Sequence, residues 1–172
     1  MENPMLSVAR VAAILAGETG VDSQPIARAL RNWVATGRLI PTSRVTRGAG
    51  GYTEAQFDRV GVCKARLALA IAAAARELPA GDIIADAEAE EIRDLDPTTG
   101  RTTVYSAEAA VNGTESGEDW FFTVSISRID GACHFSGHWS KGAPSLDFSE
   151  VEAVSIFPFS QIIRPMLADL KI

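Results

Sequence analysis

Hydrophobic residues recur at helical spacing near the start of the chain and predict a short helix there. The apolar stripe of this helix consists of Val8, Val11, Ala12 and Leu15. Ser7 precedes the stripe and is expected to cap the helix, because its hydroxyl can accept a hydrogen bond from a free amide of the first turn. Gly17 and Gly20 are expected to end the helix and to form a tight turn.

A second amphipathic helix is predicted after this turn, with Ser23 as its cap and Pro25 in its first turn, where a missing amide costs little. Its buried face is expected to comprise Ile26, Ala29, Leu30 and Trp33. The polar side chains that lie off this stripe are those of Arg28, Arg31 and Asn32. Gly37 is placed to end the helix.

A polar, glycine-rich segment follows the second helix and predicts a hairpin. Residues 38–41 form a short extended stretch, and residues 42–51 contain two arginines and end in glycines. Thr53 and Gln56 then have the spacing of a capping box, which predicts a third helix with Thr53 as its cap. The buried positions of that helix are expected to be Phe57, Val60, the aliphatic stem of Lys64, Leu67 and Ile71.

Two short helices followed by a basic, glycine-rich hairpin are typical of a winged helix-turn-helix. The residues that carry a more specific likeness are Thr19-Gly20-Val21, Leu30-Arg31, Gly37-Arg38-Leu39-Ile40-Pro41, Arg44 and Gly51-Tyr52. In order and spacing they resemble the MerR-type winged helix over residues 6–75. The resemblance implies a recognition helix, residues 24–36, in the major groove and a wing, residues 40–52, on the DNA backbone. Asn32-Trp33 departs from the aromatic pair that the family usually has there.

The resemblance also implies which side chains contact DNA. Arg28, Arg31 and Asn32 are the candidates for base contacts, because arginine can bond guanine and asparagine can bond adenine. Arg44 and Arg47 on the wing are expected to contact phosphates rather than bases. The alternative interpretation of Arg28 and Arg31 is a solvated helix face.

Alternating apolar and polar residues predict strands in the second half of the chain. The clearest strand runs from Trp120 to Ser127, and Asp130-Gly131 is a two-residue hairpin signal that leads into a partner strand over residues 133–139. Ser160 is expected to cap a last helix, in which Pro165 introduces a kink. The apolar stripe of that helix comprises Ile162, Ile163, Met166, Leu167 and Leu170.

Three further segments in this half are also predicted to be strands. Residues 105–111 alternate and end at a turn signal, Asn112-Gly113, and residues 151–157 are apolar enough for a strand. Residues 87–95 are compatible with helix or strand, and the turn signal at 96–101 favours a strand. The expected fold class is therefore α+β: a winged helix-turn-helix followed by a small antiparallel sheet of four or five strands with a C-terminal helix.

A proline and a glycine near Leu78 break the helical pattern and predict a boundary between residues 1–78 and 79–172. The formal net charge of −6, taken alone, argues against nucleic acid, but its distribution changes the picture. Residues 1–78 carry ten Lys/Arg and six Asp/Glu, whereas residues 79–172 carry six and sixteen. Phosphate binding requires a local positive potential rather than a basic chain, so the first domain remains a candidate DNA-binding module.

Other functional classes have little support in the sequence. The two cysteines, Cys63 and Cys133, do not form a disulfide framework, and the start of the chain lacks the pattern of a signal peptide, so we expect a cytoplasmic protein that does not span a membrane. His134 and His138 lie about 13 Å apart along a strand, too far for a shared zinc ion. We therefore expect no metal, no cofactor and no enzyme activity.

The sequence thus predicts a sequence-specific DNA-binding transcriptional regulator. A winged helix reads few base pairs, so we expect a homodimer that binds double-stranded DNA. Residues 79–172 would provide dimerisation, or a site for a protein or small-molecule effector. The alternative is a protein-interaction adaptor, such as a phage-type or DNA-packaging component, that uses the same helical module to dock a protein.

Overall fold

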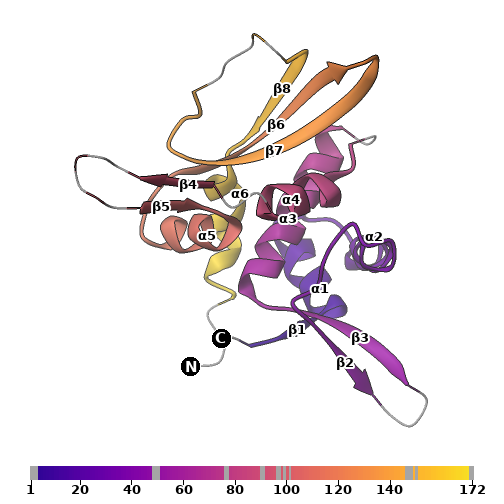
Figure 1. Cartoon of the computed structure of the whole chain (residues 1–172). Helices are drawn as coiled ribbons and strands as arrows, with labels where there is room; N and C mark the ends of the chain where they lie inside the picture. The colour runs from indigo at the N-terminus through magenta and orange to yellow at the C-terminus, as the bar shows by residue number, and fades with distance from the viewer. Residues whose placement is uncertain are drawn as a thin grey trace. The chain divides into compact units, whose positions relative to one another are not determined.

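The computed structural model divides the chain into an N-terminal unit, Met1–Asp82 with Ile163–Ile172, and a second unit, Ile83–Ile162 (Figure 1). It describes residues 4–47, 51–75, 78–89, 92–95, 98, 100, 102–145, 149 and 151–170. The division differs from the expected one because Ile163–Ile172 belong to the N-terminal unit. The fold class is mixed α+β, as expected from the sequence.

The N-terminal unit begins with strand β1 (Leu6–Ser7) and helix α1 (Val8–Thr19). Ser7 caps α1 by accepting a hydrogen bond from the Arg10 amide, which confirms the predicted start. Gly20 ends the helix in the left-handed region, with φ of 67°, while Gly17 lies inside the helix. The buried side is formed by Val8, Val11, Ala12, Ile14 and Leu15, which includes the whole predicted stripe.

Helix α2 (Ser23–Ala35) starts with a different cap from the predicted one. Asp22 is the N-cap, and its carboxylate accepts a hydrogen bond from the Gln24 amide. The prediction that Ser23 caps this helix was therefore wrong. The buried residues are Ile26, Ala27, Leu30 and Val34. Ala29 and Trp33 are half-buried, contrary to the prediction, because helical periodicity alone cannot choose between neighbouring stripes.

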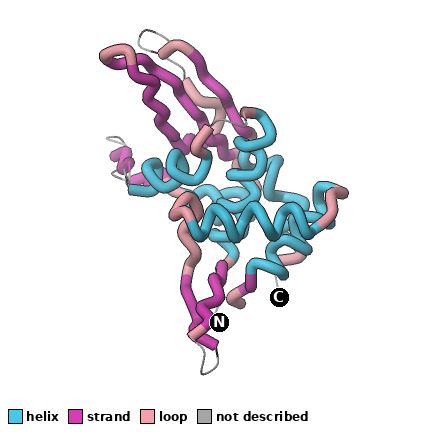
Figure 2. The backbone as a smooth tube through the Cα atoms, turned by 90° about the vertical axis from the view of Figure 1, so that its right-hand side faces the viewer, coloured by secondary structure: helices cyan, strands magenta, loops and turns pink. Residues whose placement is uncertain are grey.

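A hairpin of β2 (Ser43–Arg47) and β3 (Tyr52–Phe57) follows, and β1 adds to it in the order β1-β3-β2. It projects away from α1 and α2 of the same unit (Figure 2). The predicted capping box is wrong, because Thr53 and Gln56 lie in β3 and pair with β2. The tip of the predicted wing, residues 48–50, lies outside the described residues.

Helix α3 (Arg59–Ala74) is capped by Asp58, whose carboxylate accepts a hydrogen bond from the Gly61 amide at 2.7 Å. Leu67 and Ile71 are buried as predicted, whereas Val60 and Lys64 are only half-buried. Phe57 is fully buried, but from strand β3 rather than from the helix.

The segment whose sequence was compatible with either helix or strand contains one of each. These are helix α4 (Ala80–Ala89) and strand β4 (Ile92–Leu95). The strand prediction for residues 87–95 is wrong at its start, because α4 continues to Ala89 with Ile83, Ile84 and Ala87 buried. Strand β4 pairs with β5 (Thr102–Tyr105). The predicted turn between them, residues 96–101, lies mostly outside the described residues.

Helix α5 (Ala107–Glu115) replaces the predicted end of a strand and the predicted turn at Asn112-Gly113. Ser106 caps it by accepting a hydrogen bond from the Ala109 amide. The buried residues Ala107, Ala110, Val111, Gly113 and Thr114 follow helical spacing. Alternation at 105–111 was misleading because small alanines fit both periods.

The main sheet of the second unit has the order β7-β6-β8, with β6 (Trp120–Ile129), β7 (Ala132–Lys141) and β8 (Ala153–Phe157). The predicted hairpin is confirmed, with φ of 50° at Asp130 and 82° at Gly131. Strand β8 pairs with β6 across the hairpin. The strands described in this unit therefore form separate sheets, β4-β5 and β7-β6-β8, instead of the single predicted meander.

Aromatic side chains and a shared carboxylate hold the core of the second unit. Trp139 packs edge-on against Phe122 and Phe159, with ring centroids 4.6 and 4.8 Å apart. One oxygen of Glu88 accepts hydrogen bonds from the Trp139 indole at 3.0 Å and from the Ala107 amide at 2.8 Å. This carboxylate therefore links α4, α5 and β7.

Helix α6 (Phe159–Leu167) begins one residue before the predicted cap. The prediction that Ser160 caps it was wrong, because the Ser160 hydroxyl accepts a hydrogen bond from the Trp120 amide at 2.8 Å and lies 2.7 Å from the Thr114 hydroxyl. Pro165 lies inside the helix. A search of the described residues for a helix of sufficient length and apolarity to cross a membrane finds none.

Candidate nucleic-acid interface

The outer face of α2 presents a shallow hollow of about 610 Å³. The described residues around it are Asp22, Gln24, Pro25, Arg28, Ala29 and Asn32. Arg28 and Asn32 are exposed and lie four residues apart, one helical turn along the same face. This placement leaves both side chains accessible to a ligand that lies along the helix.

A second hollow, of about 280 Å³, lies where α2 meets the hairpin. Its described lining residues are Val8, Ala9, Arg31, Val34, Ala35, Arg44, Thr53, Glu54 and Ala55. Arg31 of α2 and Arg44 of β2 are thus brought to the same concave surface, although they are distant in sequence. Among these described residues Glu54 carries the only negative charge, so positive charge predominates.

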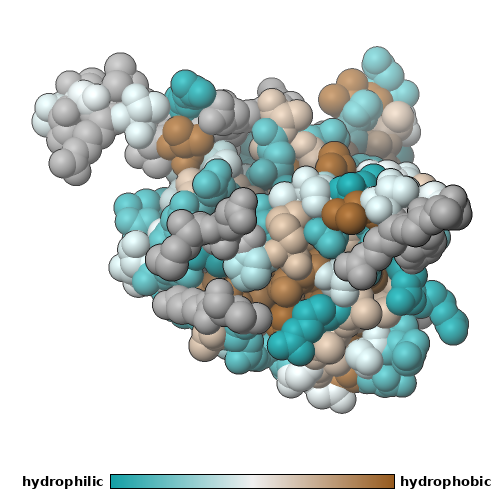
Figure 3. All heavy atoms as spheres, turned by 90° about the horizontal axis from the view of Figure 1, so that it is seen from below, coloured by the Kyte–Doolittle hydropathy of each residue, from teal (hydrophilic) through white to brown (hydrophobic). Residues whose placement is uncertain are grey.

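Arg44 also borders a third hollow, of about 290 Å³, which lies between the end of α2 and the start of β2. The exposed Ile40 and the buried Leu39 contribute to it. Figure 3 shows hydrophilic side chains mixed with hydrophobic ones on the face that it presents. The large exposed hydrophobic residues among those described are Met5, Val21, Ile40, Val45, Ile129 and Ile156. The side chain of Arg44 is thus exposed and borders two hollows.

The candidate side chains in this region have no partner within the described part of the chain. The structure shows no hydrogen bond or ion pair there for the side chains of Arg28, Arg31, Asn32 or Arg44. Arg47 pairs with Tyr52 in the β2–β3 ladder, and its side chain lies outside the described residues. The guanidinium groups of Arg28, Arg31 and Arg44 are consequently available to an anion.

Two cations of the second unit are in the opposite situation. Arg128 donates a hydrogen bond to Glu152 at 2.9 Å, and this bond raises the pKa of the Arg128 guanidinium above its usual value. Lys141 donates to Glu118 at 2.6 Å, and this bond is the main reason that the pKa of Glu118 is lowered. Both cations are already neutralised by a carboxylate, so they are poor candidates for phosphate contacts.

Two further residues line these hollows and were not among the predicted contacts. Gln24 lies one turn before Arg28 on α2, a spacing visible in the sequence, and a glutamine can bond adenine in the way that asparagine does. Thr53 presents an exposed hydroxyl beside Arg44. The mistaken interpretation of Thr53 as a helix cap concealed its place on the hairpin.

A metal site was also sought among the described residues. Within the described residues no group of at least three His, Cys, Asp or Glu side chains is arranged to hold one. His134 and His138 are exposed on β7.

A comparison of the chain with models of known protein families and with curated proteins finds no match.

Proposed function

We propose that the N-terminal unit is a winged helix-turn-helix that binds duplex DNA, as the resemblance to the MerR-type module implies. In this proposal α2 lies in the major groove, and the β2–β3 hairpin is the wing on the backbone. The observation that carries the proposal is the common hollow bordered by Arg31 of α2 and Arg44 of the hairpin. A helix and a wing must converge in this way to contact one duplex.

The charge of the two halves supports this orientation. Residues 1–78 have a net charge of +4, from ten basic and six acidic side chains, whereas residues 79–172 have a net charge of −10, from six and sixteen. Phosphates are attracted to the arginines of α2 and β2 and are repelled by the acidic half. The duplex is therefore directed to the surface of α2 and the hairpin.

Each candidate side chain has a proposed role that follows from its chemistry. Arg28, Arg31 and Asn32 on α2 contact base edges, because their planar donor groups match guanine and adenine in the major groove. Arg44 and Arg47 on β2 contact phosphates, which fix the position of the module without reading sequence.

A single module of this kind contacts few base pairs, so we propose that the protein acts as a homodimer on paired half-sites. A regulator of transcription is the function that such a dimer supports best. The second unit would then supply dimerisation or respond to an effector, and its negative charge would keep it away from the phosphates.

Fluorescence anisotropy with a labelled duplex, selected by the wild type from a random-sequence pool, tests DNA binding by the Arg31–Arg44 surface. Arg31→Ala is expected to weaken binding about tenfold, because a bidentate arginine contact is worth about 1–3 kcal/mol. Arg128→Ala is the matched control, since it makes the same change of charge at an exposed ion pair of the second unit. Equal affinity of wild type and Arg31→Ala would reject this surface, and absence of duplex binding would favour the protein-adaptor alternative.

A further inference from the structure

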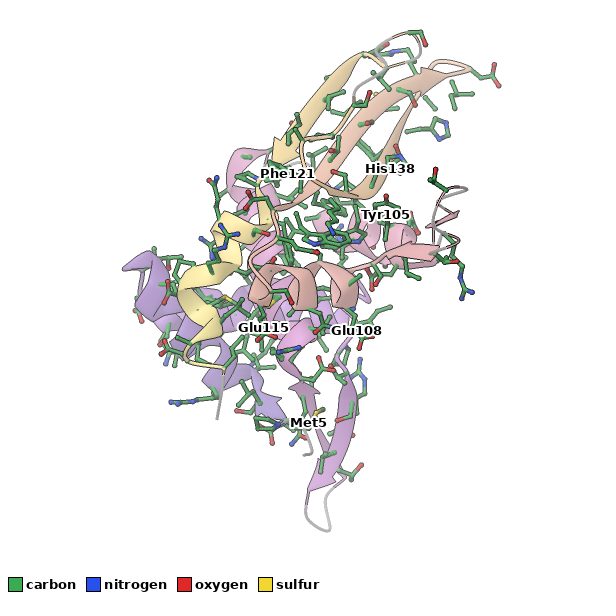
Figure 4. All side chains as sticks on the ribbon, turned by 90° about the vertical axis from the view of Figure 1, so that its left-hand side faces the viewer. Met5, Tyr105, Glu108, Glu115, Phe121 and His138 are labelled. Atoms are coloured by element: carbon green, nitrogen blue, oxygen red, sulfur yellow. The ribbon has the colours of Figure 1, made fainter. Side chains whose placement is uncertain are left out.

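A hydroxyl-rich hollow of about 330 Å³ lies on one face of the β7-β6-β8 sheet, wholly within the second unit. Its described lining residues are Thr123, Ser125, Ser136, His138, Ser140, Pro144, Ser145, Val151 and Val154. The strand register explains why they meet. Thr123 pairs with His138, and Ser125 pairs with both Ser136 and Val154, so these side chains occupy adjacent rows of one sheet face. Figure 4 labels His138 and Phe121, which lie on neighbouring strands of this sheet.

Thr123 is the most deeply buried of the described residues that line this hollow. It is only 5% exposed, and its hydroxyl oxygen is buried without a hydrogen-bond partner in the structure. A buried hydroxyl without a hydrogen bond lowers the stability of the fold. A valine, which has the same shape, would avoid this free-energy cost. Because this oxygen is itself buried, a polar group in the hollow would supply the missing hydrogen bond after rotation of the Thr123 side chain about its Cα–Cβ bond.

The remaining polar lining groups are also available to an occupant. For Ser125, Ser136, Ser145 and His138, the structure shows no side-chain hydrogen bond to another described residue. The Ser140 hydroxyl donates to the Gly142 carbonyl at 3.5 Å, a long contact that leaves its lone pairs free to accept. Hydroxyls both donate and accept hydrogen bonds, and the ring nitrogens of His138 add further polar contacts, so this set matches a ligand that both donates and accepts.

The charge of the surroundings excludes the obvious anionic ligands. No described lining residue is a lysine, arginine, aspartate or glutamate. Residues 79–172 carry a net charge of −10, from six basic and sixteen acidic side chains, which repels phosphates and carboxylates. Pro144, Val151 and Val154 supply an apolar wall, against which the C–H face of a sugar ring can pack.

We propose that this hollow binds a neutral polyhydroxylated molecule of about monosaccharide size, through the hydroxyl groups of its sugar ring. Thr123 bonds one ring hydroxyl, and the serines and His138 bond its neighbours. The volume of about 330 Å³ is at the lower end of the range for small-molecule sites, which suits a ring of this size. The same chemistry is present in a free sugar and in the ribose of a nucleoside, and binding does not depend on the proposed contact with DNA.

Nuclear magnetic resonance titrations of the full-length, isotope-labelled chain without DNA test this site. D-glucose, D-ribose and adenosine are the probes, and the amide signals of Thr123, Ser125 and His138 are followed. Saturable shifts confined to the hollow are expected for at least one probe. Binding of glucose or free ribose identifies a sugar site, whereas binding of adenosine alone identifies a nucleoside site. Absence of saturable shifts with all three would overturn the proposal.

Thr123→Val provides the decisive variant, because it keeps the shape of the side chain and removes only the hydroxyl. It is expected to weaken binding about five- to tenfold, the effect of losing one hydrogen bond, while its unfolding temperature without ligand equals or exceeds that of the wild type. Ser127→Ala is the matched control, since Ser127 lies on the same strand face but outside the hollow. Unchanged affinity of Thr123→Val would also overturn the proposal.

Discussion

The two units of this protein use surface charge in opposite ways. On the N-terminal unit, Arg31 and Arg44 border one hollow, and neither has a partner among the described residues. On the second unit, Arg128 and Lys141 are each bonded to a carboxylate. The net charge of the whole chain hides this difference, because it adds the positive charge of residues 1–78 to the larger negative charge of residues 79–172. The arrangement of individual charges is therefore more informative about function than their sum.

Gly81→Ala should have the largest effect and should disrupt the N-terminal unit. A Cβ atom at this position in α4 would lie 1.3 Å from the carbonyl oxygen of Arg38, so the backbone must move. We expect a loss of about 3 kcal/mol of unfolding free energy, at the upper end for overpacking, together with weaker duplex binding. Urea unfolding followed by circular dichroism measures the loss.

Gly17→Ala is the matched control for that substitution. Gly17 lies inside α1, and a Cβ atom added there would meet no atom within 4 Å beyond its chain neighbours and the nearby backbone of its own helix, so alanine should be neutral or stabilising by about 1 kcal/mol. Equal stability of the Gly81 and Gly17 variants would contradict the close approach of α4 to Arg38.

Glu88→Ala should have the next largest effect and should act on the second unit. It removes the acceptor for both the Trp139 indole and the Ala107 amide, and we expect a loss of about 2 kcal/mol from these unpaired donors. Near-ultraviolet circular dichroism reports the Trp139 environment during thermal unfolding. Glu108→Ala, at an exposed position in the first turn of α5, should cost less than about 1 kcal/mol, and a similar loss in both variants would argue against the link through Glu88.

Asp22→Ala tests the start of the proposed recognition helix. Loss of this N-cap should cost about 1 kcal/mol, whereas Ser23→Ala should cost a few tenths at most, because only the Asp22 carboxylate accepts from the Gln24 amide. Chemical unfolding of both variants measures the difference. A larger loss for Ser23→Ala would restore Ser23 as the cap.

The ion pair of Lys141 with Glu118 should have the smallest effect. Because the pKa of Glu118 is lowered in the folded protein, its stabilising contribution is present above the ordinary glutamate pKa of about 4.3 and is lost as the pH falls through the lowered value. In Lys141→Ala the pKa of Glu118 should rise towards the ordinary value. Carbon-13 titration of the Glu118 carboxyl measures it, and an unchanged pKa would show that Trp120 alone causes the shift.

Local patterns in the sequence predicted those elements in which short-range signals agree. The stripe from Val8 to Leu15 and the alternation from Trp120, followed by Asp130-Gly131, led to α1 and to the β6–β7 hairpin. The same rules failed at Asn112-Gly113, a turn signal inside α5. Gly113 is required there for packing, because a Cβ atom would lie 2.1 Å from the Trp120 indole nitrogen.

The candidate sites depended on contacts that no local pattern encodes. The sequence indicated that Arg31 and Arg44 face outward, but only the tertiary fold of the N-terminal unit brings them to one hollow. The hollow around Thr123 requires β8 to pair with β6, and the missing hydrogen-bond partner of its hydroxyl is a property of the folded sheet. The periodicity of the sequence predicts neither of these two hollows.

The most direct test of the central claim is the salt dependence of duplex binding by the full-length chain. If Arg44 and Arg47 each contact one phosphate, the slope of log affinity against log salt should be about −2 or steeper per protomer, at about −0.9 for each contact. Arg44→Ala should be shallower by about 0.9, and Arg128→Ala should match the wild type. A slope near zero, or equal slopes for the wild type and Arg44→Ala, would contradict the claim that the hairpin lies on the DNA backbone.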